Sequence, residues 1–290
     1  MISTGPLRHA GRSVWAARLI LGLGAVLLAL SSVVGARQVY EGLISRPEYS
    51  NPSRKTNYAL ELHGSEGALL YYGGFHRVDP RDPQFDDIEA KWVAFRPTFA
   101  LSEGCIWPLA DSREEAIRLY GEQGLLRFLA SRDGVPISSL DPPLSCQLRF
   151  LRRFHQAHEI RVFYVLRQAC IHRMLKKDRL ELRKYAERFL RDLSLVRGYQ
   201  TGPSSLDDFR ALVAALFPEL GEWENVTERY FYDPEVGQFL STMHSRLNEY
   251  RDRFMIRTLM KKLKKGHRVF AVVGRIHVLR QEPVLRTHLG

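Results

Sequence analysis

The stretch RVFAVVGRIH, residues 268–277, decides how the C-terminal half of the chain folds. Five apolar residues, 269–273, follow one another directly, and Gly274 ends the run before His277. A short continuous apolar run that stops at a glycine is typical of a buried strand. We therefore expect a buried strand here, with a histidine just beyond its carboxyl end.

A second stretch, ALLYYGGFH at residues 68–76, has the same form. Its apolar run reaches Gly73, and His76 follows three residues later. Of the 21 glycines, only Gly73 and Gly274 have a histidine three positions on. In an open α/β sheet, functional groups gather beyond the carboxyl ends of the strands, where glycine permits a sharp turn. If the two strands are neighbours, both imidazoles reach one site.

A carboxylate is expected at the same edge of the sheet. The segment PTFALSEG, residues 97–104, predicts a second strand of the N-terminal half, and Glu103 lies at its end. Two histidines and one carboxylate form a ligand set for a divalent ion such as Mn²⁺, Co²⁺ or Zn²⁺. Alternatively, Glu103 is a general base, and the histidines orient or protonate a substrate.

The rest of the first half alternates strands with helices. DPQFDDIEAKWVAF, residues 82–95, has apolar residues at helical spacing, and Asp82 is a suitable N-cap. A further helix is expected over 112–131 and a strand within GVPISSL, residues 134–140. This alternation favours a mixed α/β fold with a central sheet flanked by helices.

The second half is mostly helical in pattern. Residues 143–245 are expected to form a helical insertion that caps the sheet, because Leu, Phe and Arg recur there at helical spacing. We expect a helix at about 206–217, a long helix from about 234 to 265 and a last helix over 281–288. The folded domain would then cover 67–290.

The N-terminus has the pattern of a targeting segment. Three arginines precede residues 19–36, which carry no charge, and small residues lead up to Ala36. Such a pattern is typical of a cleaved secretory signal or of an uncleaved membrane anchor with a cytoplasmic N-terminus. We therefore expect a signal peptide or transmembrane helix over 1–36 and a tether over 37–66. The domain would be exported, either periplasmic or extracellular, or held at the membrane.

Net charge bears on the possible binding partners, and cysteine content bears on possible disulfides. The net charge is +11 and the pI is about 9.7, yet the chain has neither zinc-finger spacing nor an RNA-binding aromatic signature. A nucleic-acid partner is therefore not expected.

Cys105, Cys146 and Cys170 allow at most one intramolecular disulfide. A Cys105–Cys146 bridge and buried free thiols are the two alternatives.

Three blocks of the chain resemble the TraB/PrgY/GumN family. They are residues 69–104, 122–143 and 249–289, and two of them carry the Gly-x-x-His pairs. The resemblance implies that both histidines and a glutamate share a site. It also implies metal-dependent peptidase activity, as in the related Tiki proteases, or metal-independent ester hydrolysis, as in the erythromycin esterases. A haem-binding lipoprotein branch is also similar.

Two residues depart from the family pattern, and three others have two possible roles. Gly74 stands where the family often has Thr, and Arg275 replaces a small residue. Arg275 either binds an anionic substrate group or indicates a degraded metal site. Arg251 and Asp252 either form a solvated ion pair or face the site, where Arg251 would hold a carboxylate or oxyanion. Asp141 either caps the following helix or supports the site.

Together, these patterns predict an exported or membrane-tethered hydrolase. It would be a metal-assisted peptidase or amidase, acting on a peptide or small molecule. The alternative is a regulator or a non-enzymatic carrier of haem or peptide on the same fold. The expected metal ligands are His76, His277 and Glu103. Glu103 and Arg251 would be catalytic, and the supporting residues would be Gly73, Gly274, Asp252 and Asp141.

Overall fold

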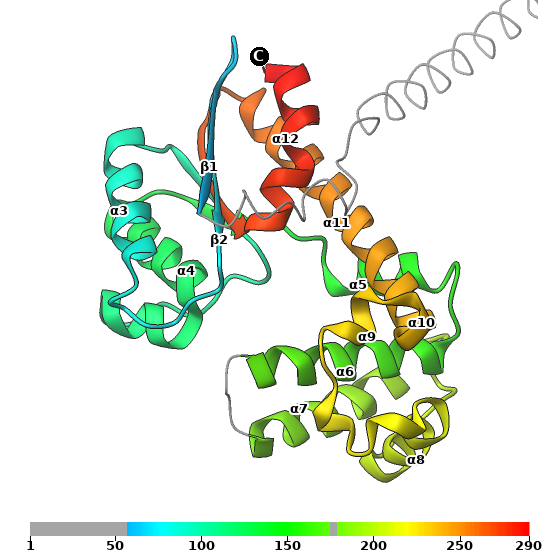
Figure 1. Ribbon diagram of the computed structural model, residues 1–290. Helices are drawn as coiled ribbons and strands as arrows, with labels where there is room; N and C mark the ends of the chain where they lie inside the picture. Colours follow the sequence, from blue (N-terminus) through cyan, green and yellow to red (C-terminus); the bar gives the residue numbers. More distant parts are fainter. Residues whose placement is uncertain (1–56, 175–178, 290) are drawn as a thin grey trace, which may run out of the picture.

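The computed structural model describes residues 57–174 and 179–289, which form two lobes (Figure 1). One is an α/β lobe built on a five-stranded sheet, and the other is a lobe of helices only. Ten α-helices are present in the described part of the chain. The mixed α/β fold expected from the sequence is therefore confirmed.

The sheet has the strand order β1-β2-β5-β3-β4. β1 is antiparallel to β2, and the other neighbours are parallel. The strands are β1 (Tyr58–His63), β2 (Ala68–Gly74), β3 (Phe99–Ser102), β4 (Ile137–Ser139) and β5 (Arg268–Gly274).

The register of β2 and β5 brings the two Gly-x-x-His stretches together. The strands are parallel neighbours, and Gly74 pairs with Gly274. β3 lies on the other side of β5, with Ser102 opposite Val272, so Glu103 emerges at the same edge. The expectation that the two strands are adjacent is confirmed.

Helices cover both faces of the sheet. On one face, α3 (Pro83–Phe95) and α4 (Arg113–Arg132) pack against side chains such as Phe270 and Val272. On the other, α12 (Arg275–Leu289) and the C-terminal half of α11 (Phe239–Leu263) pack against Val269 and its neighbours. The side chain of Asp82 accepts a hydrogen bond from the amide of Gln84, as expected of the N-cap of α3.

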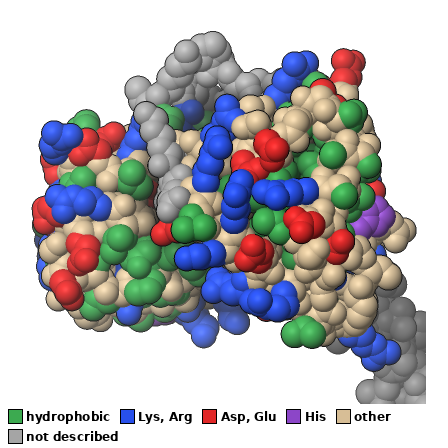
Figure 2. Space-filling model, turned by 90° about the horizontal axis from the view of Figure 1, so that it is seen from below, with side chains coloured by type: hydrophobic (Ala, Val, Ile, Leu, Met, Phe, Trp, Pro, Cys, Tyr) green, Lys and Arg blue, Asp and Glu red, His purple; other side chains and the backbone are tan. Residues whose placement is uncertain are grey.

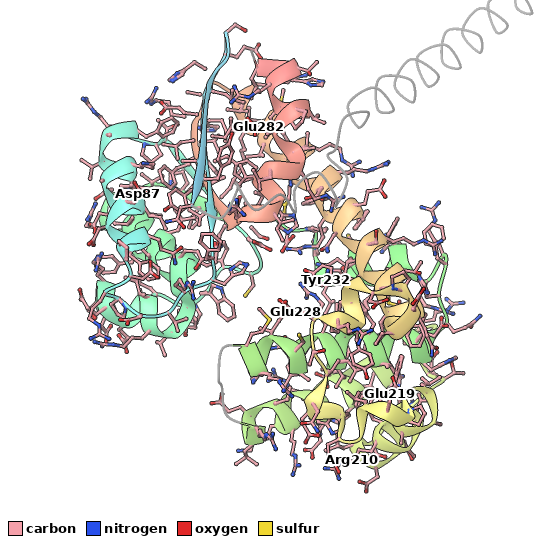
Figure 3. The ribbon with its side chains drawn as sticks, in the orientation of Figure 1. Asp87, Arg210, Glu219, Glu228, Tyr232 and Glu282 are labelled. Carbon is pink, nitrogen blue, oxygen red and sulfur yellow. The ribbon has the colours of Figure 1, made fainter. Side chains whose placement is uncertain are left out.

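The helical lobe has a hydrophobic core of its own. That core runs from Leu148 to Leu247 and includes the fully buried Phe163 and Phe209. Its helices are α5 (Leu144–Leu151), α6 (Ala157–Met174), α7 (Arg179–Ser194), α8 (Leu206–Leu216), α9 (Arg229–Tyr232) and α10 (Pro234–Gly237), with short 3₁₀ turns at Pro218–Leu220 and Trp223–Asn225. Glu228 and Tyr232 lie on the side of this lobe that faces the sheet (Figure 3).

α11 belongs to both lobes. Leu247 packs in the helical core, and Met255 packs against the sheet. This helix is shorter than the sequence predicted, because Gln238 adopts a φ of 49° and separates it from α10. Residue 237 must be a glycine, because the carbonyl oxygen of Tyr230 occupies the position that a Cβ there would need. The expected helix over 234–265 is therefore wrong at its N-terminal end.

Two further element predictions are corrected. The expected tether over 37–66 contains β1, whose alternation buries Leu60 and Leu62 against the core while Glu61 is exposed. The last helix begins at Arg275, directly after β5, rather than at 281. His277 therefore lies in the first turn of a helix.

The prediction of a transmembrane helix is also corrected. In the part of the chain that the structure describes, no helix is long and apolar enough to cross a bilayer. The segments on which the signal or anchor and most of the tether were predicted, 1–36 and 37–56, lie outside the described residues. All three cysteines are free thiols, so the Cys105–Cys146 bridge is not formed.

Candidate functional site

Three side chains from three strand ends meet around Gly274. Its amide donates a hydrogen bond of 2.5 Å to Oε2 of Glu103. A Cβ at this glycine would lie only 2.8 Å from Nε2 of His76 and 3.4 Å from Oε2 of Glu103. On the other side of the carboxylate, Nε2 of His277 lies 3.4 Å from Oε1. The structure thus brings together His76, Glu103 and His277.

Glu103 is an enclosed carboxylate surrounded by positive charge. Its Oε1 accepts a 2.5 Å hydrogen bond from Nη2 of Arg251, and its side chain is only 14% exposed. Burial alone would raise the pKa of Glu103, but the charges of His277 and Arg251 outweigh it and hold the pKa well below its usual range. The carboxylate is therefore ionised at neutral pH.

Arg251 joins two carboxylates beneath the site. Its Nε and Nη2 donate to the two oxygens of Asp141, each at 2.8 Å, in addition to the bond with Glu103. Asp141 also accepts from the amide of Gly104 at 2.9 Å, and α5 has no side-chain N-cap. Arg251 is 5% exposed. Of the alternatives left by the sequence, Arg251 and Asp141 therefore both face the site.

His277 is held by Asp252, the residue that directly follows Arg251 in α11. Nδ1 of His277 lies 2.6 Å from Oδ1 of Asp252, which is fully buried and also accepts from Gln281 at 2.8 Å. Nη1 of Arg280 lies 2.8 Å from the other oxygen. Burial lowers the pKa of His277, but the negative charges of Asp252 and Glu103 outweigh this effect and raise the pKa to about 9.

His76 is held by a different carboxylate. Its Nδ1 and its backbone amide nitrogen both lie 2.9 Å from Oε1 of Glu122. Partial desolvation of the ring lowers the pKa of His76, but the hydrogen bond and charge of Glu122 outweigh this and raise the pKa to about 9. His76 has a φ of 55°, a left-handed conformation that non-glycine residues seldom adopt. The strained backbone directs the imidazole toward Gly274.

The sequence analysis missed Glu122. This residue is 1% exposed and follows a kink in α4 at Gly121, whose φ is 60°. Gly74 provides the space, because a Cβ there would lie 2.7 Å from Oε1 of Glu122. The available signal was the sequence GEQG, in which Gly121 and Gly124 interrupt a helical pattern.

Gln281 was missed as well, and Arg275 proves to be close to the site. Gln281 is fully buried one turn after His277, and its Oε1 accepts from the hydroxyl of Tyr71 at 3.0 Å.

Arg275 begins α12, and its guanidinium lies 5.6 Å from the ring centre of Phe75. It therefore stands beside the segment that carries His76.

A divalent ion fits this arrangement only in part. Each histidine places Nδ1 against a carboxylate, which is the usual outer-shell support of a metal-bound imidazole. However, both oxygens of Glu103 already accept bonds of 2.5 Å, from Arg251 and Gly274. Over residues 57–174 and 179–289, no three His, Cys, Asp or Glu side chains are arranged to hold an ion. As placed, the residues do not fit a metal.

Comparison of the chain with protein-family models, with curated proteins and with solved structures gives no match. The resemblance to the TraB/PrgY/GumN proteins therefore stays a hypothesis that rests on the residues of this chain.

Proposed function

We propose that the chain is a hydrolase of ester or amide bonds, with His76, Glu103 and His277 at its centre. The observation that carries the proposal is the pair of imidazoles, each oriented through Nδ1 by its own carboxylate and both adjacent to Glu103. An imidazole held by a carboxylate is a common general acid–base group. The TraB/PrgY/GumN resemblance, carried by the same residues, points to the same reaction class.

His76 is the proposed general base. Its side chain is 54% exposed, whereas that of His277 is 10% exposed, so substrate and water reach His76 first. Because the pKa of His76 is raised to about 9, only a minor fraction of the imidazole is neutral at pH 7, and in that fraction Nε2 takes a proton from water as the water oxygen attacks the acyl carbon. The resulting imidazolium then returns that proton to the leaving alcohol or amine as its bond to carbon breaks.

His277 and Arg251 provide positive charge on the enclosed side of the site. The pKa of His277 is raised to about 9, so this imidazole is protonated at neutral pH. Charge fixed in an enclosed site stabilises an oxyanion that develops nearby. Glu103 holds both cations in place and keeps the site electrically balanced. No step requires a metal ion.

The test is a screen of peptide, amide and ester substrates with the wild type and the variants His76→Ala and His277→Ala. We expect hydrolysis by the wild type and a loss of kcat/KM of about 100-fold or more in each variant. His63→Ala is the matched control, since His63 is also exposed and lies 3.0 Å from a carboxylate, Glu61. Equal activity in all four proteins would refute the assignment.

Metal analysis and pH dependence separate this mechanism from its rivals. We expect full activity in EDTA and a kcat/KM that rises with pH toward about 9, the pKa of His76. If the wild type binds one metal ion per chain and His277→Ala binds none, the metal-assisted mechanism would be favoured over acid–base hydrolysis. A haem Soret band that depends on His76, with no hydrolysis, would favour the carrier function instead.

A further inference from the structure

A cavity in the helical lobe lies apart from the site around Gly274. It has a volume of about 750 Å³ and is lined by α5, α7 and the segment that follows α7. This volume is within the range of 300–1,000 Å³ found for small-molecule sites. None of its lining residues belongs to the Gly-x-x-His stretches or to the carboxylates that support them.

The wall of the cavity is apolar. Leu148 and Phe189 form part of its buried surface, and Tyr185 lies beside Phe189 with the two rings stacked at 5.7 Å. Val196, 43% exposed, stands on the open side. An alkyl chain or an aromatic body entering this space would exchange water for hydrocarbon contacts, which favours binding.

The same cavity carries a strong excess of positive charge. Four of its lining residues are arginines, and Asp192 is the only acidic one. Asp192 lies 3.9 Å from Arg191, which is not part of the lining. Figure 2 shows Lys and Arg side chains on the underside of the molecule, with hydrophobic side chains and some Asp and Glu side chains between them.

Three of these arginines are available to a ligand. Arg149, Arg188 and Arg197 are exposed, and none forms an ion pair with another described residue. The fourth, Arg152, is engaged: Nη1 donates to the carbonyl of His155 at 2.9 Å, and its guanidinium lies 5.6 Å from the ring centre of Tyr199. Guanidinium groups at the mouth of an apolar cavity match a carboxylate on an apolar chain.

We infer that this cavity binds a small amphipathic anion, with its alkyl or aryl body against Leu148 and Phe189 and its carboxylate among the exposed arginines. The inference is independent of the proposed hydrolase activity, because it uses different residues in a different lobe. It assigns the helical lobe a ligand of its own.

The test is calorimetric titration of the full chain with dodecanoate below its micellar concentration at neutral pH. We expect one molecule bound per chain and markedly weaker binding of dodecylammonium, which has the same tail and the opposite charge. Shortening the chain should weaken binding by up to about fourfold for each methylene removed, equivalent to about 0.8 kcal/mol. No binding, or equal binding of the two head groups, would overturn the inference.

Matched variants locate the binding. Arg149→Gln together with Arg188→Gln should weaken dodecanoate binding about tenfold, since both guanidinium groups face the head group. Lys184→Gln removes one positive charge from α7, the helix that also carries Arg188, but lies outside the lining, so binding should change by less than about twofold. An equal loss in the two proteins would mean general charge attraction rather than this cavity. His277→Ala should bind normally, whatever its effect on hydrolysis.

Discussion

The two Gly-x-x-His stretches have the same spacing, yet the chain takes a different path after each strand. After Gly74 it enters a loop, and His76 adopts a left-handed conformation with its side chain 54% exposed. After Gly274 it enters α12 at once, and the His277 side chain is 10% exposed. The strand end therefore fixes where each imidazole lies, and the following element decides how far water reaches it.

The largest expected difference is in stability. His277→Ala leaves Asp252 buried without its imidazole partner and should lower the free energy of unfolding by about 2–4 kcal/mol. His76→Ala removes a half-exposed ring, and the buried Glu122 keeps its bond from the amide of residue 76, so the loss should be smaller, about 1–2 kcal/mol. Urea denaturation followed by circular dichroism at pH 7 measures both. Equal losses would mean that the two imidazoles are not differently enclosed.

Alanine substitutions at Gly73 and Gly274 should lower the free energy of unfolding by different amounts. A Cβ at Gly73 would lie 2.8 Å from the Cα of Arg275, so Gly73→Ala must move backbone and should cost about 1–3 kcal/mol. A Cβ at Gly274 would instead meet the ring tip of His76, which can rotate away. Gly274→Ala should therefore cost less than about 1 kcal/mol but shift the imidazole resonances of His76. The reverse order of stabilities would contradict the geometry.

Stability should also depend on pH through His277. Its pKa is raised from 6.5 to about 9, so its contribution is complete below pH 6.5 and is lost as pH rises through about 9. Glu103 has the opposite sign, since its lowered pKa gives stability that is lost in acid. We expect the wild type to lose roughly 1–3 kcal/mol between pH 6.5 and 9. A flat profile there would contradict this assignment, and His277→Ala should be flatter than the wild type.

The smallest effect should come from Glu122→Gln. The variant keeps an oxygen near the amide of His76 but removes the charge, so stability should change by less than about 1 kcal/mol. The pKa of His76 should fall from about 9 toward 6.5, while that of His277 should stay near 9. NMR titration of the imidazole protons distinguishes the two. A parallel fall in both would show that the rings share one electrostatic environment.

Local patterns predicted most of the sheet and part of the site. The apolar runs of β2 and β5, and the helices that follow β2 and β3, were evident because their periodicity or their glycine boundaries are strong. β1 was missed, since its six alternating residues adjoin a polar stretch. The break at Gln238, where φ is 49°, interrupts an otherwise helical pattern, and no local signal in the sequence marks it.

The partners of the two histidines could not be predicted, for a similar reason. Asp252 reaches His277 only because α11 packs beside α12, and the sequence left Asp252 equally consistent with a solvated face. Glu122 required a kink within a helix and a glycine on a neighbouring strand. Spacing located the groups that carry the proposed chemistry, whereas tertiary packing selected the groups that set their charge.

α11 passes from one hydrophobic core into the other, and Arg251 and Asp252 lie between the two packed sections (Figure 1). The backbone that carries Arg251 and Asp252, the side chains that hold Glu103 and His277, is therefore positioned by two separate hydrophobic cores.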